Sequence, residues 1–268
     1  MSFNQLKVED IEKIFIKIYE NACELLEEAE LLYNHEKYAR AYLCAHIAFE
    51  EFGKLPMLNT VVLNINQGIK TDWKKLNRRI RDHKQKITQS YTTVSYVLKK
   101  LIEKYKGQRS NKEYKSQKSN KIPVFDNKLE EIKYVIENEI EINPMDILDY
   151  AKSPDRINDL KIIKCMSLLL NEYKNSSLYA DFNEGRFLKP SESIDKETCE
   201  YALILAYIQK KFIDIPKIHI HGYKPYLMSD EIKKILRKDW EEVNKHFEEI
   251  NRHFKGGFNT HPVNTKQT

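Results

Sequence analysis

The sequence predicts an all-helical protein, on three grounds. Only seven of its 268 residues are glycine, and long stretches contain neither Gly nor Pro, so few positions force the chain to turn. Leu, Ile, Lys and Glu are abundant, as is typical of helical proteins. Apolar residues recur at three- and four-residue steps, which places them on one face of a helix. We expect one helical domain over 1–255 and a flexible tail over 256–268.

The first predicted helix runs from about Val8 to Tyr33, because Ile11, Phe15 and their successors form a continuous apolar stripe. A break at Asn34 separates it from the second helix.

The second predicted helix begins at about Tyr38 and is rich in apolar residues. Its alanines carry little side chain, so neighbouring helices can approach closely. Pro56 can kink this helix without stopping it, and we expect it to end at Gly68.

The third predicted helix begins at Trp73, where Thr71 or Asp72 can act as the N-cap, and frays near Gly107. Residues 107–121 contain almost no apolar side chain, so a mobile basic loop is expected there.

The second half of the chain contains four further predicted helices. They cover about 127–139, 157–173, 195–212 (opened by Ser193 or Asp195) and 229–254. Residues 175–185 do not follow a helical pattern, and a turn is expected there.

The net charge of +5 is unevenly distributed. Residues 70–128 contain 18 Lys or Arg but five Asp or Glu, a local charge of about +13. Such a segment predicts an anionic partner, most simply nucleic acid. The candidate contacts on the third helix are Lys74, Lys75, Arg79 and Arg81. The alternative is a solvated basic face with no ligand.

No metal or other cofactor is expected. The cysteines at 23, 44, 165 and 199 show no Cys-x-x-Cys spacing, so reduced buried thiols are expected rather than zinc or disulfides. His219 and His221 alone are too few for a metal site. No apolar run is long enough to cross a bilayer, and the N-terminus has no signal-peptide core. We therefore expect a cytoplasmic protein without membrane contact.

Arg78 and His83, with four residues between them, are the candidate catalytic pair. A histidine can remove the proton of a hydroxyl group near neutral pH, and an arginine can stabilise a phosphate in the transition state. Together they suffice for metal-free cleavage of RNA by its own 2′-hydroxyl. Arg and His at such a spacing are expected about once by chance in this composition, and Arg40 with His46 gives a second case.

His46, Glu50 and Lys54 follow one another at four-residue steps, a spacing that lets their side chains meet. A carboxylate in so apolar a stretch is costly unless it is paired. Two interpretations stay open: ordinary ion pairs at a helix end, or a polar cluster at the mouth of a helical core.

Three short motifs resemble landmarks of the AbiV abortive-infection family, in the same order. They are Glu50-Glu51-Phe52-Gly53-Lys54, His83-Lys84-Gln85-Lys86, and Leu178-Tyr179-Ala180-Asp181, in which Ala180 stands where the family usually has Val. The resemblance covers roughly residues 20–210.

The resemblance implies a HEPN-like antiparallel helical bundle, with Arg78 and His83 as catalytic residues. The additional C-terminal helices of the predicted fold lie beyond the resemblance and follow from the helical pattern after residue 210. Residue Arg79 stands where such enzymes often have a small polar residue. Glu50, Glu51, Lys54, Lys86, Tyr179 and Asp181 would support the site. Alternatively, the Glu-Glu-x-Gly-Lys residues form a packing network, and Tyr179 is a core residue bonded to Asp181.

By this resemblance the protein is an antiphage ribonuclease toxin that shuts down translation. The expected partners are RNA (tRNA or ribosome-associated), a phage-encoded activator protein, and a second copy in a homodimer. The alternatives are a non-catalytic module that blocks translation by binding RNA, ribosomes or a phage protein, and a helical scaffold with neither property.

Overall fold

The structure is a computed structural model, and it describes residues 6–110, 125, 127–143, 145–146, 149–150, 168–183 and 185–237. Nearly all of this part of the chain is helical, and its only sheet is one two-stranded hairpin. The all-helical prediction is confirmed. In chain order, the elements are α1 (Val8–Asn34), α2 (Tyr38–Phe52), α3 (Leu55–Asn66), α4 (Trp73–Arg81), α5 (His83–Ser110), α6 (Lys128–Asn138), a helical segment over 168–178, β1 (Asp181–Asn183), β2 (Arg186–Leu188), α9 (Pro190–Ser193), α10 (Lys196–Asp214), α11 (Ile218–His221), α12 (Tyr223–Met228) and α13 (Asp230–Arg237).

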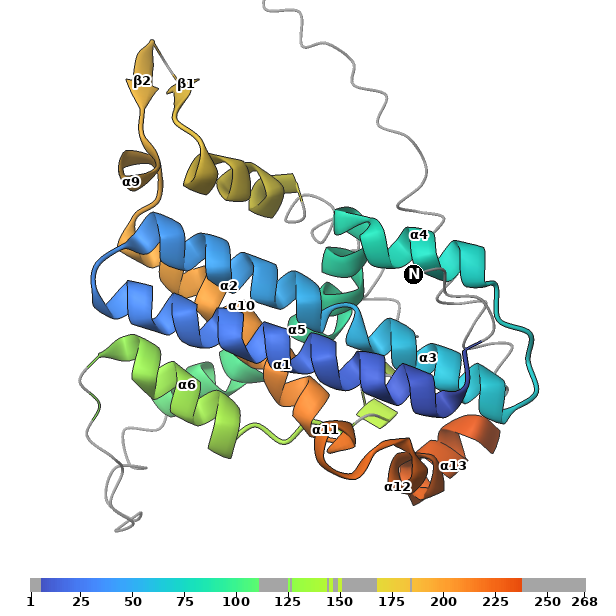
Figure 1. Cartoon of the computed structure of the whole chain (residues 1–268). Coiled ribbons are helices and arrows are strands. Elements are labelled where there is room, and N and C mark those ends of the chain that lie inside the picture. The colour runs from blue at the N-terminus through green and yellow to red at the C-terminus, as the bar shows by residue number, and fades with distance from the viewer. Residues whose placement is uncertain are drawn as a thin grey trace, which may run out of the picture.

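Helix α2 lies at the centre of the bundle, packed between α1 and α10 (Figure 1). A short turn containing Glu36, whose φ of 58° is left-handed, reverses the chain so that α1 and α2 are antiparallel. Ala41, Ala45 and Ala48 are fully buried. These small side chains let α2 approach its neighbours closely, as the sequence predicted.

The ends of several helices match the predictions because their capping residues act locally. Asp72 accepts a hydrogen bond from the backbone N–H of Lys75 at 2.8 Å and begins α4. Asp195 does the same for Thr198 at 2.8 Å and begins α10. Each cap satisfies a backbone donor that the first helical turn leaves unpaired.

The third predicted helix is in fact two helices, and that prediction was wrong. Asp82 has extended backbone angles (φ −83°, ψ 112°), so α4 ends at Arg81. The Asp82 carboxylate accepts a hydrogen bond from the N–H of Gln85 at 3.2 Å, which starts α5 at His83. An aspartate that serves as an N-cap competes with a continuous helix.

Two other boundaries also differ from the predictions. Helix α5 continues to Ser110, so the expected basic loop cannot begin at 107; residues 111–121 lie outside the described part. The expected turn at 175–185 begins later, because the helical segment runs to 178 and the β1–β2 hairpin follows. This hairpin projects away from the bundle (Figure 1).

The central predicted helix is likewise divided, because α2 ends at Phe52 and α3 begins at Leu55, next to Pro56. The predicted helix over 229–254 is described only as far as Arg237, and the predicted tail over 256–268 lies outside the described residues.

The C-terminal helices pack on the bundle. Tyr223 of α12 is fully buried; its hydroxyl donates to Asn59 Oδ1 of α3 at 2.9 Å, and its N–H donates to Glu12 Oε2 of α1 at 2.8 Å. The prediction of additional C-terminal helices is confirmed through Arg237. Within the described residues, the helices lack the combination of length and apolar character needed to span a membrane.

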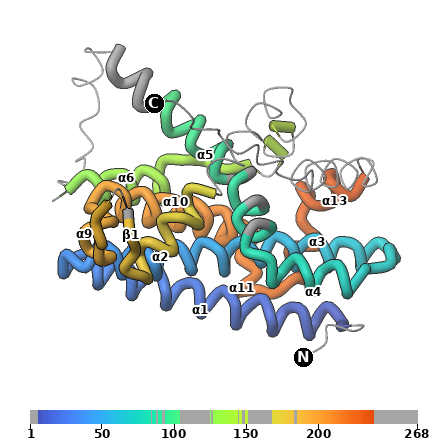
Figure 2. The backbone as a smooth tube through the Cα atoms, turned by 90° about the horizontal axis from the view of Figure 1, so that it is seen from above, coloured from blue at the N-terminus to red at the C-terminus, as the bar shows by residue number. Residues whose placement is uncertain are grey.

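The close crossing of α2 and α5 depends on Gly53. A Cβ atom added there would lie 2.6 Å from the backbone oxygen of Lys86 and 2.5 Å from Ser90 Oγ. The φ of Gly53 is −64°, which any residue can adopt, so the space beside α5 is what requires glycine. Figure 2 shows the bundle turned by 90° about the horizontal axis, with α5 leading out of it.

We predict that Gly53→Ala destabilises the protein by about 1–3 kcal/mol, because the added methyl group pushes the α5 backbone away. Urea denaturation measures this change. Lys13→Ala is the control: it truncates an exposed side chain on α1, away from α5, so it should change stability by less than about 0.5 kcal/mol. Equal stability of wild type and Gly53→Ala would contradict the inferred close packing.

Candidate functional site

The candidate site is centred on Glu50, a buried carboxylate near the end of α2. Its side chain is only 4% exposed. His46, one helical turn earlier, is also buried, and its Nε2 lies 3.0 Å from Glu50 Oε1. The predicted i,i+4 contact between these two residues is therefore present.

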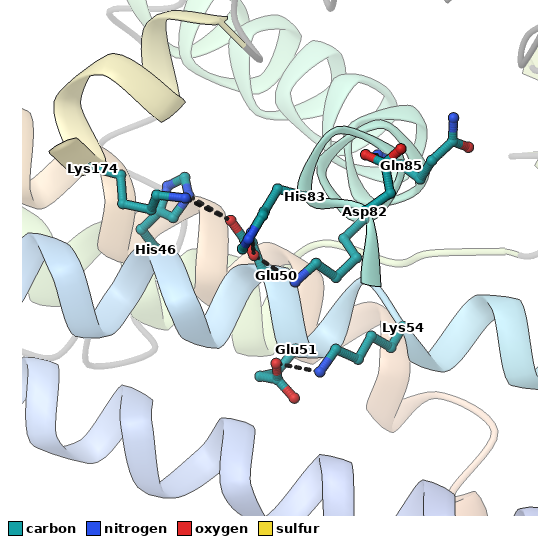
Figure 3. A network of polar contacts seen from close by, with 9 residues as sticks. His46, Glu50, Glu51, Lys54, Asp82, His83, Gln85 and Lys174 are labelled. Carbon is teal, nitrogen blue, oxygen red and sulfur yellow. Dashed lines mark hydrogen bonds and ion pairs between the residues drawn. The ribbon is translucent and has the colours of Figure 1, made fainter. Parts of the chain in front are cut away.

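Helix α5 brings two more partners to the same carboxylate. His83 Nδ1 lies 2.6 Å from Glu50 Oε2, and Lys86 Nζ lies 2.7 Å from the same oxygen. His83 and Lys86 are three residues apart in the first turn of α5, so both face α2. A fourth group, Lys174 Nζ from the helical segment over 168–178, lies 3.8 Å from Glu50 Oε1. Figure 3 shows His46, Lys174 and His83 around Glu50.

These partners keep Glu50 ionised despite its burial. Burial alone would raise the pKa of Glu50, but hydrogen bonds from His46 and Lys86, together with the positive charge of Lys86, lower it well below its usual value. Burial lowers the pKa of His46, although Glu50 opposes this effect. His46 is therefore neutral near pH 7 and donates its Nε2 proton to the carboxylate.

His83 differs from His46 because its imidazole is 59% exposed. The ionised Glu50 can only accept hydrogen bonds, so His83 must donate from Nδ1. In neutral His83 the lone pair is then on Nε2, the ring nitrogen that does not contact Glu50. A carboxylate that fixes the tautomer of a histidine is a recurring arrangement at sites of proton transfer.

Glu51, at the end of α2, forms a separate pair with Lys54, which lies in the turn before α3. Lys54 donates to Glu51 Oε1, and Figure 3 shows this pair beside the Glu50 group. Of the three residues at four-residue steps, His46 and Glu50 therefore meet, whereas Lys54 pairs with Glu51. This placement agrees with the packing interpretation for Glu51 and Lys54, whereas Glu50 and Lys86 meet His83 directly.

Arg78 lies on α4 and is exposed. Within the described part of the chain, no hydrogen bond or ion pair joins the side chains of Arg78 and His83. The break at Asp82 separates their helices. Arg79 instead donates from Nη2 to Gln89 Oε1 at 3.2 Å.

The basic candidates on α4 divide by face. Lys74, Arg78 and Arg81 are exposed, on the side opposite the buried Leu76 and Ile80. Their spacing of four and three residues places them in one stripe along the helix, which we call the α4 basic stripe. The remaining candidates, Lys75 and Arg79, are half-buried.

Tyr179 and Asp181 lie at the base of the hairpin, and neither contacts Glu50. Tyr179 is 65% exposed, so the interpretation of Tyr179 as a core residue was wrong. Asp181 Oδ1 accepts a hydrogen bond from the N–H of Phe182 at 2.7 Å. Lys174, one turn before the end of the preceding helical segment, is the residue from this region that reaches Glu50.

Lys174 was not among the predicted site residues. Nothing in the sequence indicates it, because more than a hundred residues separate it from Glu50. His46 could have been added to the site from its four-residue spacing to Glu50.

Among the described residues, no three His, Cys, Asp or Glu side chains are grouped as metal ligands. His219, one of the two histidines considered for a metal, stacks on Tyr19 with 4.3 Å between ring centroids. Its Nδ1 lies 4.0 Å from Asp214 Oδ1.

The fold and site define a class of protein: a helical bundle in which a buried glutamate from one helix orients an exposed histidine on another. Residues 10–209 match the family model of AbiV, a HEPN-type family. The chain belongs to this family and is an abortive-infection protein with a HEPN domain. Searches of curated proteins and of solved structures found no match.

We predict that Glu50→Gln destabilises the protein by about 3 kcal/mol or more at pH 7, because Lys86 is left buried without its counter-charge. The lowered pKa of Glu50 means that the unfolded chain binds a proton near pH 4.5, where the folded protein does not. The extra stability of wild type over Glu50→Gln is therefore fully present above about pH 4.5 and decreases as the pH falls.

Urea denaturation of both proteins at pH 7 and pH 3 measures this difference. Glu20→Gln is the control, since it neutralises an exposed carboxylate on α1 and should change stability by less than about 0.5 kcal/mol at either pH. An advantage over Glu50→Gln that is as large at pH 3 as at pH 7 would contradict the ionised state of Glu50.

Proposed function

We propose that this protein is a metal-independent ribonuclease toxin of antiphage defence, with His83 as its general base. The observation that carries this proposal is the contact between His83 Nδ1 and the buried Glu50 carboxylate, combined with an imidazole that is 59% exposed. RNA can reach such a side chain, whereas a histidine sealed in the core could not serve.

The proposed reaction uses only groups of the RNA and of the protein. His83 Nε2 removes the proton of a ribose 2′-hydroxyl, whose oxygen attacks the adjacent phosphorus. The bond from phosphorus to the 5′ oxygen breaks, leaving a 2′,3′-cyclic phosphate and a 5′-hydroxyl. The 5′ oxygen takes a proton from water or from the His83 of a second copy. Glu50 stabilises the imidazolium that forms in the first step.

Arg78 is the proposed stabiliser of the charge that grows on the phosphate. It lies on the α4 basic stripe, so a strand bound along that stripe would run toward the beginning of α5. A homodimer that joins two such sites, a tRNA or ribosome-associated RNA target, and a phage-encoded activator belong to the same proposal.

We predict that the wild-type protein cleaves total RNA in the presence of EDTA and that His83→Ala is slower by about 100-fold or more. Mapping the ends should give 2′,3′-cyclic phosphates. His221→Ala, which removes another exposed histidine, is the matched control and should cleave at the wild-type rate. No cleavage by wild type, or equal cleavage by His83→Ala, would refute the nuclease.

The alternative is a non-catalytic module that blocks translation by occupying RNA or ribosomes. The exposed α4 basic stripe favours it, because a row of cations suffices to bind a phosphate backbone. In this case the Glu50 group would only hold α5 and the helical segment over 168–178 against α2.

Charge reversal measures the contribution of the stripe. We predict that Lys74→Glu combined with Arg78→Glu weakens RNA binding at least about tenfold at physiological salt. The control is Lys13→Glu with Lys17→Glu, an equally spaced exposed pair on α1, which should bind normally. Growth inhibition that survives His83→Ala but not the α4 reversal would support the occupancy mechanism over the nuclease.

A further inference from the structure

Lys174 places a second positive charge near Glu50, whose carboxylate is already paired with Lys86 and His46. Its Nζ is 3.8 Å from Glu50 Oε1, beyond the 2.7–3.2 Å of an ordinary hydrogen bond. Lys86 already forms the close ion pair at 2.7 Å, and His46 donates to Oε1 at 3.0 Å. Within the described residues, the Lys174 ammonium makes no hydrogen bond, although its side chain is only 15% exposed.

The charges around the carboxylate therefore do not cancel. Glu50 contributes one negative charge, whereas Lys86 and Lys174 contribute two positive charges. Burial lowers the pKa of His46 and outweighs the opposing effect of Glu50, so His46 adds no charge near pH 7. The excess positive charge is complementary to one anionic group.

The position of Lys174 relative to His83 indicates where that anion would lie. Lys174 is near Oε1 of Glu50, and His83 is bonded to Oε2 of the same carboxylate. They come from different elements, the helical segment over 168–178 and α5, and converge on Glu50 (Figure 3). The exposed imidazole leaves this group open to a ligand from solvent.

We propose that Lys174 is a phosphate-binding residue of this site, whose ammonium holds a phosphate of the RNA strand next to His83. This inference rests on the proposed ribonuclease function and adds to it a cation from outside the basic segment 70–128. A phosphate satisfies the N–H groups of Lys174 that Glu50 leaves unbonded. The competing interpretation is that Lys174 is only a second counter-ion for the buried carboxylate.

The experiment measures binding without cleavage. The full-length protein is titrated with a short single-stranded RNA in which every ribose is 2′-O-methylated, so that no 2′-hydroxyl can attack. Lys174→Met should weaken binding about tenfold and lower the slope of log affinity against log salt by about 0.7, the effect of one lost phosphate contact. Lys174→Arg should retain most of the affinity. Lys189→Met, which removes an exposed lysine beyond the hairpin, should bind like wild type.

A second arm uses inorganic phosphate as the probe. The imidazole resonances of His83 should shift on phosphate addition and saturate in wild type, and this shift should be lost in Lys174→Met. Far-UV circular dichroism of each variant tests whether the fold is retained. If Lys174→Met unfolds, Lys174→Arg still decides between the two interpretations. If Lys174 only balances charge, Lys174→Arg should bind phosphate and RNA like wild type, and the phosphate-induced shift of His83 should be the same in both proteins. If Lys174 binds the phosphate, the altered donor geometry of arginine should change that shift.

The outcomes separate this inference from the nuclease proposal. If RNA binding depends on Lys174 but wild type does not cleave RNA, the phosphate-binding role of Lys174 is supported and the nuclease proposal is refuted. RNA binding, salt dependence and His83 shifts that are unchanged in folded Lys174→Met would overturn the inference. Binding of inorganic phosphate but not of RNA would also overturn it, since the site would then serve a small phosphate ligand.

Discussion

The candidate site depends on the hydrogen bonds and the ion pair that the buried carboxylate of Glu50 accepts. The central position of α2 takes this group out of water, and a lone buried charge would cost several kcal/mol. Hydrogen bonds from His46, His83 and Lys86 offset that cost. Because two of these partners come from α5, the same bonds that make the buried charge tolerable also fix where α5 begins and which way His83 points.

Two local features of the backbone make this contact possible. Gly53 removes the side chain that would separate α2 from α5. Asp82 interrupts the helix, so that His83 is the first residue of a new one. His83 therefore sits at the exposed start of α5, whereas Lys86, one turn later, is buried against Glu50. One residue of the turn faces solvent and the other supports the carboxylate.

The break at Asp82 also separates the two functions that the basic segment suggested. The α4 basic stripe is suited to a phosphate backbone, and the beginning of α5 is suited to proton transfer. Arg78 and His83 were joined by their spacing in the sequence, but they belong to different helices. In the proposed nuclease, their cooperation would therefore require a bound strand, or a second copy of the chain, that spans both helices.

The sequence alone determined what depends on neighbouring residues. The apolar stripe of α1, the caps at Asp72 and Asp195, and the i,i+4 contact of His46 with Glu50 were predictable because each involves groups within one or two helical turns. The family motifs were also visible, although the break at Asp82 was missed. Only the tertiary structure decided that Lys54 pairs away from Glu50 and that Lys174 approaches it. Periodicity shows which face of a helix is buried, but which other helix that face meets depends on the packing of the whole bundle.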